Sequence, residues 1–159
     1  MSRSYDILTA AQAAIAVSGA NVDLSATGRV LIGMWPGPPI GGAFVCLSED
    51  SVSTAEAVDV TRWTYRAAML IQAWAPADSD SQAARIEAAQ AIRSDILAAL
   101  HGAVVDPSTR AAAMRTASVR DVQIASSVMA GEMIADAWAG WGYAQVQMAY
   151  TADGGPGEF

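Results

Sequence analysis

The chain contains no lysine, one histidine and one cysteine among its 159 residues. A single cysteine cannot form an internal disulfide, which excludes the cross-linked framework of small secreted domains. One histidine and one cysteine also cannot supply a zinc site, which needs clustered ligands. A serine hydrolase triad would have to use His101, and the sequence has no GxSxG turn. We therefore predict no catalytic residue, no cofactor and no metal.

Phosphate-binding motifs are also missing. The glycine-rich stretch at residues 37–42 contains two prolines, which lack the backbone N–H groups that a phosphate cradle needs, so we interpret it as a turn. Cys46 lies in the apolar run 43–47 and is interpreted as a buried thiol. A nucleophilic cysteine would need a base nearby, and His101 is the only histidine available.

Charge is scarce and mostly negative. Nine arginines face sixteen acidic residues, giving a formal net charge of −7, and only 16% of residues are charged. A protein of this kind does not hold nucleic acid by neutralising phosphates. No segment reaches the roughly 18 to 20 apolar residues of a membrane span, and the N-terminus lacks a signal-peptide pattern. We therefore expect synthesis in the cytoplasm and no membrane partner.

The order of predicted elements indicates an α+β fold. We expect a mostly antiparallel sheet packed against one long helix plus an N-terminal helix, forming a single domain over residues 1–150 with a flexible tail at 151–159. Residues 131–140 fit either a short helix or a strand. The helices are predicted at 5–17, 82–100 and from 106 to 114, and the strands at 29–34, 43–48, 60–74, 119–129 and 141–150.

Two of these elements carry the clearest patterns. In the helix 82–100, one face collects Ile86, Ala89, Ile92, Ile96, Leu97 and Leu100 at helical spacing. In the strand 60–74, alternation places Trp63, Tyr65, Ala67, Met69 and Ile71 on one face. The polar segment 49–59 between two strands is predicted to be an exposed hairpin connection.

Aromatic residues make up only 7% of the chain, yet five of them are tryptophans. Trp138 and Trp141 lie among alanines and glycines, whose side chains are too small to bury both indoles well. Exposed aromatic residues with small neighbours are typical of protein–protein contacts, although tryptophans are also ordinary core residues. The sequence leaves both interpretations open.

In element order, size and residue type, the chain resembles the tail terminator (tail-completion) proteins of long-tailed bacteriophages. The resemblance covers nearly the whole chain, and residues 131–138 fit it least. It is carried by an N-terminal helix containing ILTAA (7–11), the approach WPGPP (35–39) and the strand 63–74. It continues with a helix containing AARIEAA (83–89) that ends at Leu100, His101 and Gly102, and with the final strands 119–129 and 141–150.

The resemblance implies a structural virion protein, not an enzyme, that forms a homo-hexameric ring in the tail or neck. Such a ring caps the tail tube protein, ends tube growth and joins the head–tail connector, while DNA passes through its lumen without specific binding. On this basis we expect subunit contacts at Trp138, Trp141, Tyr143 and Trp74. We expect docking on a neighbouring ring by Glu49, Asp50, Glu56 and Asp59.

Three alternatives remain at this stage. A head–tail connector or stopper protein of the phage neck would share the same general composition. A contractile machine related to phage tails would use a similar subunit. A small-ligand-binding or enzymatic α+β domain belongs to a different class, and would differ by holding a closed pocket that binds a small molecule without a partner.

Overall fold

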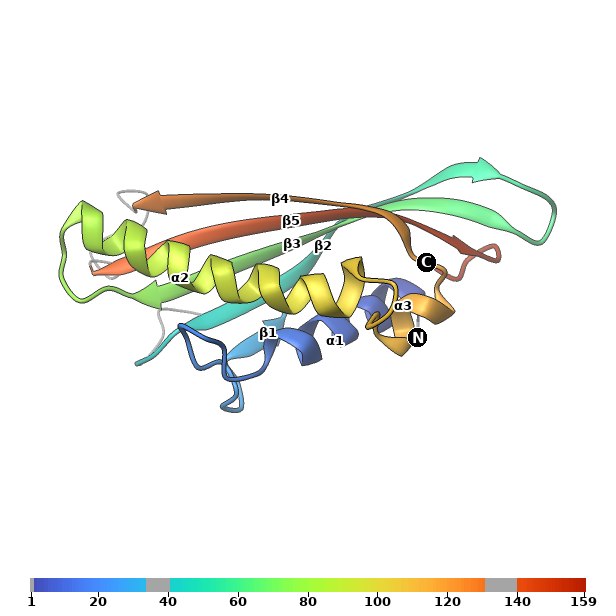
Figure 1. Cartoon of the computed structure of the whole chain (residues 1–159). Coiled ribbons are helices and arrows are strands. Elements are labelled where there is room, and N and C mark those ends of the chain that lie inside the picture. The colour runs from blue at the N-terminus through green and yellow to red at the C-terminus, as the bar shows by residue number, and fades with distance from the viewer. Residues whose placement is uncertain (1, 34–40, 131–139) are drawn as a thin grey trace.

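The computed structural model describes residues 2–33, 41–130 and 140–159, and it places helices on one side of a long sheet (Figure 1). This arrangement confirms the predicted α+β class, with a mostly antiparallel sheet, one long helix and an N-terminal helix. The elements in chain order are α1 (Arg3–Ile15), β1 (Val30–Ile32), β2 (Phe44–Ala57), β3 (Trp63–Pro76), α2 (Gln82–Leu100), the π-helical turn η1 (His101–Val105), α3 (Ala112–Thr116), β4 (Arg120–Ala130) and β5 (Trp141–Gly154).

The described strands form one five-stranded sheet in the order β1-β2-β3-β5-β4. β1 is parallel to β2, and every other neighbouring pair is antiparallel. β1 covers only Val45 to Leu47 of β2, so most of the outer edge of β2 extends beyond it. β4 forms the opposite edge of the sheet.

Helix α2 has the bounds that its sequence pattern predicts. Its start is capped by Ser81, whose Oγ accepts a hydrogen bond from the backbone N–H of Ala84 at 3.2 Å. Its buried residues are Ala89, Ile92, Ile96 and Leu100, a stripe at helical spacing that lies on the sheet. The helix therefore buries one narrow face and leaves the remainder partly or fully exposed.

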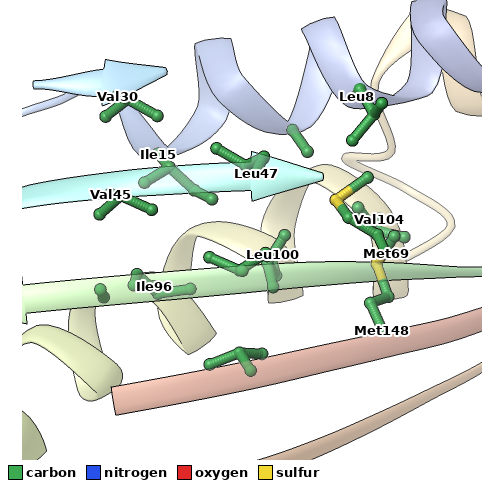
Figure 2. Packing of buried hydrophobic residues seen from close by; sticks show 14 of the residues in the cluster. Leu8, Ile15, Val30, Val45, Leu47, Met69, Ile96, Leu100, Val104 and Met148 are labelled. Carbon is green, nitrogen blue, oxygen red and sulfur yellow. The ribbon is translucent and has the colours of Figure 1, made fainter. Parts of the chain in front are cut away.

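The main core lies between the helices and one face of the sheet, called here the inner face. α1 contributes Ile7, Leu8, Ala11 and Ile15, which pack with the α2 stripe and with inner-face residues such as Leu47 and Met69. Figure 2 shows Leu8, Ile15, Leu47, Ile96, Leu100 and Met148 gathered between these layers. The alternation predicted for strand 60–74 is confirmed from Tyr65 onward, since Tyr65, Ala67, Met69 and Ile71 are all buried.

A carboxylate ties the segment that follows α1 to α2. Asp95 Oδ2 accepts hydrogen bonds from the backbone N–H groups of Asn21 (2.9 Å) and Val22 (2.7 Å), and Oδ1 accepts from Asn21 Nδ2 (2.8 Å). A Cβ on Gly19 would lie 2.3 Å from Asp95 Oδ2. A glycine is therefore required where the chain passes over this carboxylate.

The prediction of an exposed connection at residues 49–59 is wrong over most of its length. β2 continues to Ala57, paired with β3 through two register shifts, so only a short turn separates the two strands. Polar side chains along this half of β2 resemble those of a loop, but backbone pairing with β3 keeps the segment extended.

The final strand is also longer than predicted. β5 runs to Gly154, four residues past the predicted end at Tyr150, so part of the predicted tail at 151–159 belongs to the sheet. Beyond it, the Phe159 ring lies 4.5 Å from the Tyr65 ring, and Glu158 forms an ion pair with Arg3 at 2.9 Å. These contacts fasten residues 155–159 to the body of the domain.

The remaining boundaries differ modestly from prediction. The N-terminal helix starts two residues earlier than predicted and ends two earlier, and β4 begins at Arg120 and not at residue 119. The short helix predicted from residue 106 instead begins at Ala112. Asp106 Oδ1 accepts from the Ser108 N–H at 2.9 Å, which favours a turn there. Most of the ambiguous segment 131–140 lies outside the described residues, namely residues 131–139, which include Trp138. Residues 34–40, which include Trp35, also lie outside them.

We predict that Gly142→Ala destabilises the fold because β5 approaches α2 too closely for a side chain. A Cβ at residue 142 would lie 2.2 Å from the Arg85 carbonyl oxygen and 2.7 Å from the Ala89 nitrogen. Overpacking of this kind costs about 1–3 kcal/mol, which should lower the urea midpoint. Gly102→Ala is the control, because the nearest atom to its Cβ is 3.9 Å away. Equal midpoints for both variants would contradict the prediction.

We predict that Phe159→Ala loosens residues 155–159. The variant removes an aromatic contact of the kind that contributes about 0.5–1.5 kcal/mol beyond burial. Amide hydrogen exchange at residues 155–159 should become faster, while exchange in α2 stays as it is. Val60→Ala serves as the control, since Val60 is 91% exposed. Fast exchange at residues 155–159 in the unaltered chain would show that the contact does not hold in solution.

Candidate assembly surface

The face of the sheet opposite the helices, called here the outer face, is lined by alternate residues of the long strands. Its middle carries Gln72 of β3, Gln145 and Gln147 of β5, and Ala125 and Ser127 of β4. Their neighbours in sequence, such as Val146 and Met148, point into the core. Leu70 lies among them, beside Gln147, and Asp50, which reaches Gln147, is the charge found there.

Hydrogen bonds link the amide side chains of the outer face. Gln72 Nε2 donates to the Tyr143 hydroxyl at 3.0 Å, and that hydroxyl donates to Gln145 Oε1 at 3.1 Å. Gln147 Nε2 donates to Asp50 Oδ2 at 3.0 Å. The chain of bonds orients these side chains along the surface.

An aromatic cluster occupies one end of the outer face. Phe44 of β2 stacks on Trp74 of β3 at 4.7 Å between ring centroids, and it meets the edge of Trp141 at 6.2 Å. Trp74 lies 5.2 Å from Tyr143. Phe44 is fully buried and Trp74 is 8% exposed, so a small second core forms on this side of the sheet.

Three of the four predicted contact residues therefore come together. Trp74, Trp141 and Tyr143 share the aromatic cluster, whereas Trp138 lies outside the described residues. Trp141 and Tyr143 are half-buried and keep surface for a neighbour, while Trp74 has little left. Sequence reasoning missed Phe44, although its alternation with Cys46 in an apolar strand marks both as residues of one face.

The four acidic residues predicted to dock do not form one cluster. Glu49, Asp50 and Glu56 are spread along β2, and Asp59 lies in the turn to β3. The Asp59 carboxylate accepts hydrogen bonds from the Thr61 hydroxyl (2.8 Å) and the Thr61 N–H (2.7 Å), which hold its pKa below the ordinary value. Asp59 thus orders the tip of the hairpin.

Cys46 and His101 cannot act as a catalytic pair. Cys46 lies in the aromatic cluster of the outer face, whereas His101 follows α2, which covers the inner face. Burial raises the pKa of the Cys46 thiol to about 11 from the ordinary 9.0. The thiol is therefore uncharged at neutral pH, and His101 lies on the other side of the sheet from it.

The described residues form several open clefts, and a small one of about 160 Å³ lies on the outer face between β4 and β5. Two larger clefts lie beside the helices. One, of about 410 Å³, lies between α1 and α3 and is walled largely by alanines. The other, of about 490 Å³, lies beside the first half of α2 and carries Asp23, Asp78 and Glu87 among alanines. Neither cleft contains a histidine or cysteine, and no three potential metal ligands gather in the described part of the chain. None of the helices described is long and apolar enough to cross a membrane.

We predict that Cys46 of the folded chain reacts slowly with a thiol reagent such as DTNB. A pKa raised by two units lowers the thiolate fraction at pH 8 by about 100-fold, and burial blocks access in addition. The rate should rise toward the free-thiol value in urea and, for the folded chain, with pH up to about 11. Equal rates in the folded and unfolded chain would contradict the burial of Cys46.

No protein-family model matches the chain, and no curated protein is similar enough to indicate a family. A functional assignment for this protein rests on its own residues: a sheet with one covered face, an open polar face with an aromatic cluster, and a projecting hairpin.

Proposed function

We propose that the chain is a structural subunit of a ring, acting as the terminator of a phage tail tube. The observation that carries the proposal is the outer face, a long sheet surface that no described helix covers and whose middle is almost free of charge. An enzyme of this size would instead concentrate titratable groups in a concave site. A surface of this shape and polarity suits a wall around a passage.

The electrostatics support a passage for DNA. The glutamines, serines and alanines of the outer face offer no cation that would hold a phosphate. Toward the hairpin end this face carries two arginines. Arg120 is paired with Asp153 at 2.8 Å, and Arg66 of β3 is exposed beside Ser53 and Thr151. With a net charge of −7, the whole chain repels DNA weakly, so that DNA passes without binding.

The β2–β3 hairpin supports docking on the tail tube. Its tip projects beyond the helices (Figure 1) and exposes Val60 (91%) and Val58 (45%). The turn is held by Asp59, so the tip keeps one shape before it meets a partner. The tip thus presents two exposed valines beside one carboxylate, Asp59, and one guanidinium, Arg62, which fits a partner surface with an apolar pocket and a polar rim. We propose the last ring of tail tube protein as that surface.

The opposite end of the ring would meet the head–tail connector. A connector or stopper protein could use the same open face, since it also surrounds DNA. The two functions differ in the partner of the hairpin, which is a tube ring for a terminator and a portal-side ring for a connector. The protein would then be located in the tail or neck of the virion.

We predict that the purified chain forms a ring near 98 kDa, six times the 16.4 kDa of one subunit, and that this ring caps one end of tail tubes. Native mass spectrometry and electron microscopy with tubes of the neighbouring tail tube protein would measure both. Val58→Asp with Val60→Asp should abolish capping while leaving the ring mass unchanged. Binding to portals but not to tubes would favour the connector, and a monomer that binds neither would contradict both.

A further inference from the structure

Over most of its length, the outer edge of β4 lacks the charged residues and prolines that normally prevent the edges of two sheets from pairing. Residues 122–130 contain no charged residue, proline or glycine. Among the described residues, no strand pairs with this edge. Its N–H and C=O groups are therefore available to another strand, which in a monomer is a hazard that proteins normally block with charges or bulges. The register shift of β4 lies at the start of this segment, between Arg120 and Gln123.

The second open edge belongs to β2. β1 occupies this edge only from Val45 to Leu47, and Gly33 donates a further hydrogen bond to the Leu47 carbonyl at 2.8 Å. From Ser48 to Ala57 no described strand lies on that side. β1 therefore limits where a second strand can pair with this edge of β2, since the edge is free only after Leu47.

We infer that β4 of one copy pairs with the free edge of β2 in a second copy. The two strands run in opposite directions within one sheet, so copies related by rotation about an axis along the strands meet with β4 and β2 antiparallel. The same surfaces then recur at every contact, and the association is head-to-tail, which closes into a ring when the rotation allows it. The inference rests on the proposed ring function.

The two faces of the sheet determine the register. Ala125 and Ser127 point to the outer face, as do Ser51 and Ser53 of β2, which pair with Ala68 and Arg66. In a sheet that continues from one copy into the next, outer-face residues must lie opposite outer-face residues. The register between β4 and β2 can therefore change only in steps of two residues. One register of this kind places Ser53 opposite Ala125 and Ser51 opposite Ser127. Because Asp50 is an extra residue in β2, Met129 then lies opposite Ser48, and pairing ends there because β1 occupies Leu47.

This register has a geometric consequence. Within one copy, the pairing across the sheet puts Ala125 in line with Leu70 of β3 and Ser48 of β2. In the contact, Ala125 faces Ser53, which pairs with Arg66, four residues before Leu70 in β3. The contact therefore shifts neighbouring copies by four residues, or about 13 Å, across four strands that span about 19 Å. The strands would tilt by about 35° from the ring axis, which lies within the range of closed β-barrels.

The side chains that would meet are compatible. Small residues face one another across Ser51–Ser127 and Ser53–Ala125, so the backbones approach without obstruction. The charges on this part of β2 are Glu49, Asp50 and Glu56. Glu49 and Glu56 would lie opposite Val128 and Gln123, and Asp50 is the extra residue between Glu49 and Ser51. None of them meets a like charge, because residues 122–130 carry none. Because β2 itself carries charges and bulges, two β2 edges are disfavoured as partners for each other.

Cysteine cross-linking tests this contact. In a Cys46→Ala background, the full chain with Ser51→Cys and Ser127→Cys is treated with a short bismaleimide over a series of protein concentrations. The two positions lie on different edges of one sheet, so they cross-link between copies and not within one. We expect a ladder of covalent multimers up to the ring.

Controls separate this contact from other associations. Ser94→Cys with Ser127→Cys should give no ladder, because Ser94 is exposed on α2. Dimers from Ser127→Cys alone would show β4 pairing with β4 and would overturn the inference. Monomers at every concentration would overturn it as well. A cross-linked ring that fails to cap tubes would support the edge contact and contradict the terminator function. Capping of tubes by a protein that does not cross-link would support the terminator function and contradict the edge contact.

A charge pair gives an independent readout. Ala125→Glu with Ser53→Glu places like charges opposite one another and should lower the multimer fraction in native mass spectra. Ala125→Lys with Ser53→Glu should restore that fraction. Both positions are exposed in the single chain, so circular dichroism should be unchanged. Equal multimer fractions in the two double variants would overturn the proposed register.

Discussion

The close contact between α2 and the inner face of the sheet is the constraint on which the rest of the structure depends. Gly142 of β5 lies directly beneath the helix backbone at Arg85 and Ala89, with no room for a side chain. The buried helix stripe begins with alanine and continues with isoleucines, so the separation between helix and sheet is small at one end and filled by larger side chains farther along. Through Asp95, the same helix holds the segment that follows α1.

Because the described helices all lie on one side, the two faces of the sheet have different roles. The inner face is a continuous apolar core reaching from α1 to β5. The outer face has a small aromatic core at one end and hydrogen-bonded amides in the middle. A single layer of helices on a sheet leaves the other face to solvent or to partners, and here the middle of that face carries amides and hydroxyls that solvent can hydrate.

The edges of the sheet follow a similar division. Over residues 122–130 the edge of β4 carries no charge, whereas the free part of β2 is interrupted by bulges and carries carboxylates. An assembly built from such edges depends on main-chain hydrogen bonds, which are directional but tolerant of sequence. The side chains then need only be small and free of like charges, and the alanine-rich composition satisfies this requirement.

The sequence by itself determined the elements whose signals are local. The spacing of Ala89, Ile92, Ile96 and Leu100 predicts α2 with its observed bounds, because helical periodicity acts within one segment, whereas the structure shows which residue before the helix caps it. Alternation in β3 likewise predicts which side chains enter the core. The α+β class follows from the order of these segments.

Only the tertiary structure decided where β2 and β5 end and which aromatic residues meet. Ser51, Ser53 and Glu56 resemble loop residues, and they remain in a strand because β3 supplies hydrogen-bond partners from a distant part of the sequence. Phe159 is held by Tyr65, and Phe44 by Trp74 and Trp141, through contacts between residues far apart in the chain. Pairing and packing of this kind depend on the folded arrangement, whereas composition describes only what each segment would do alone.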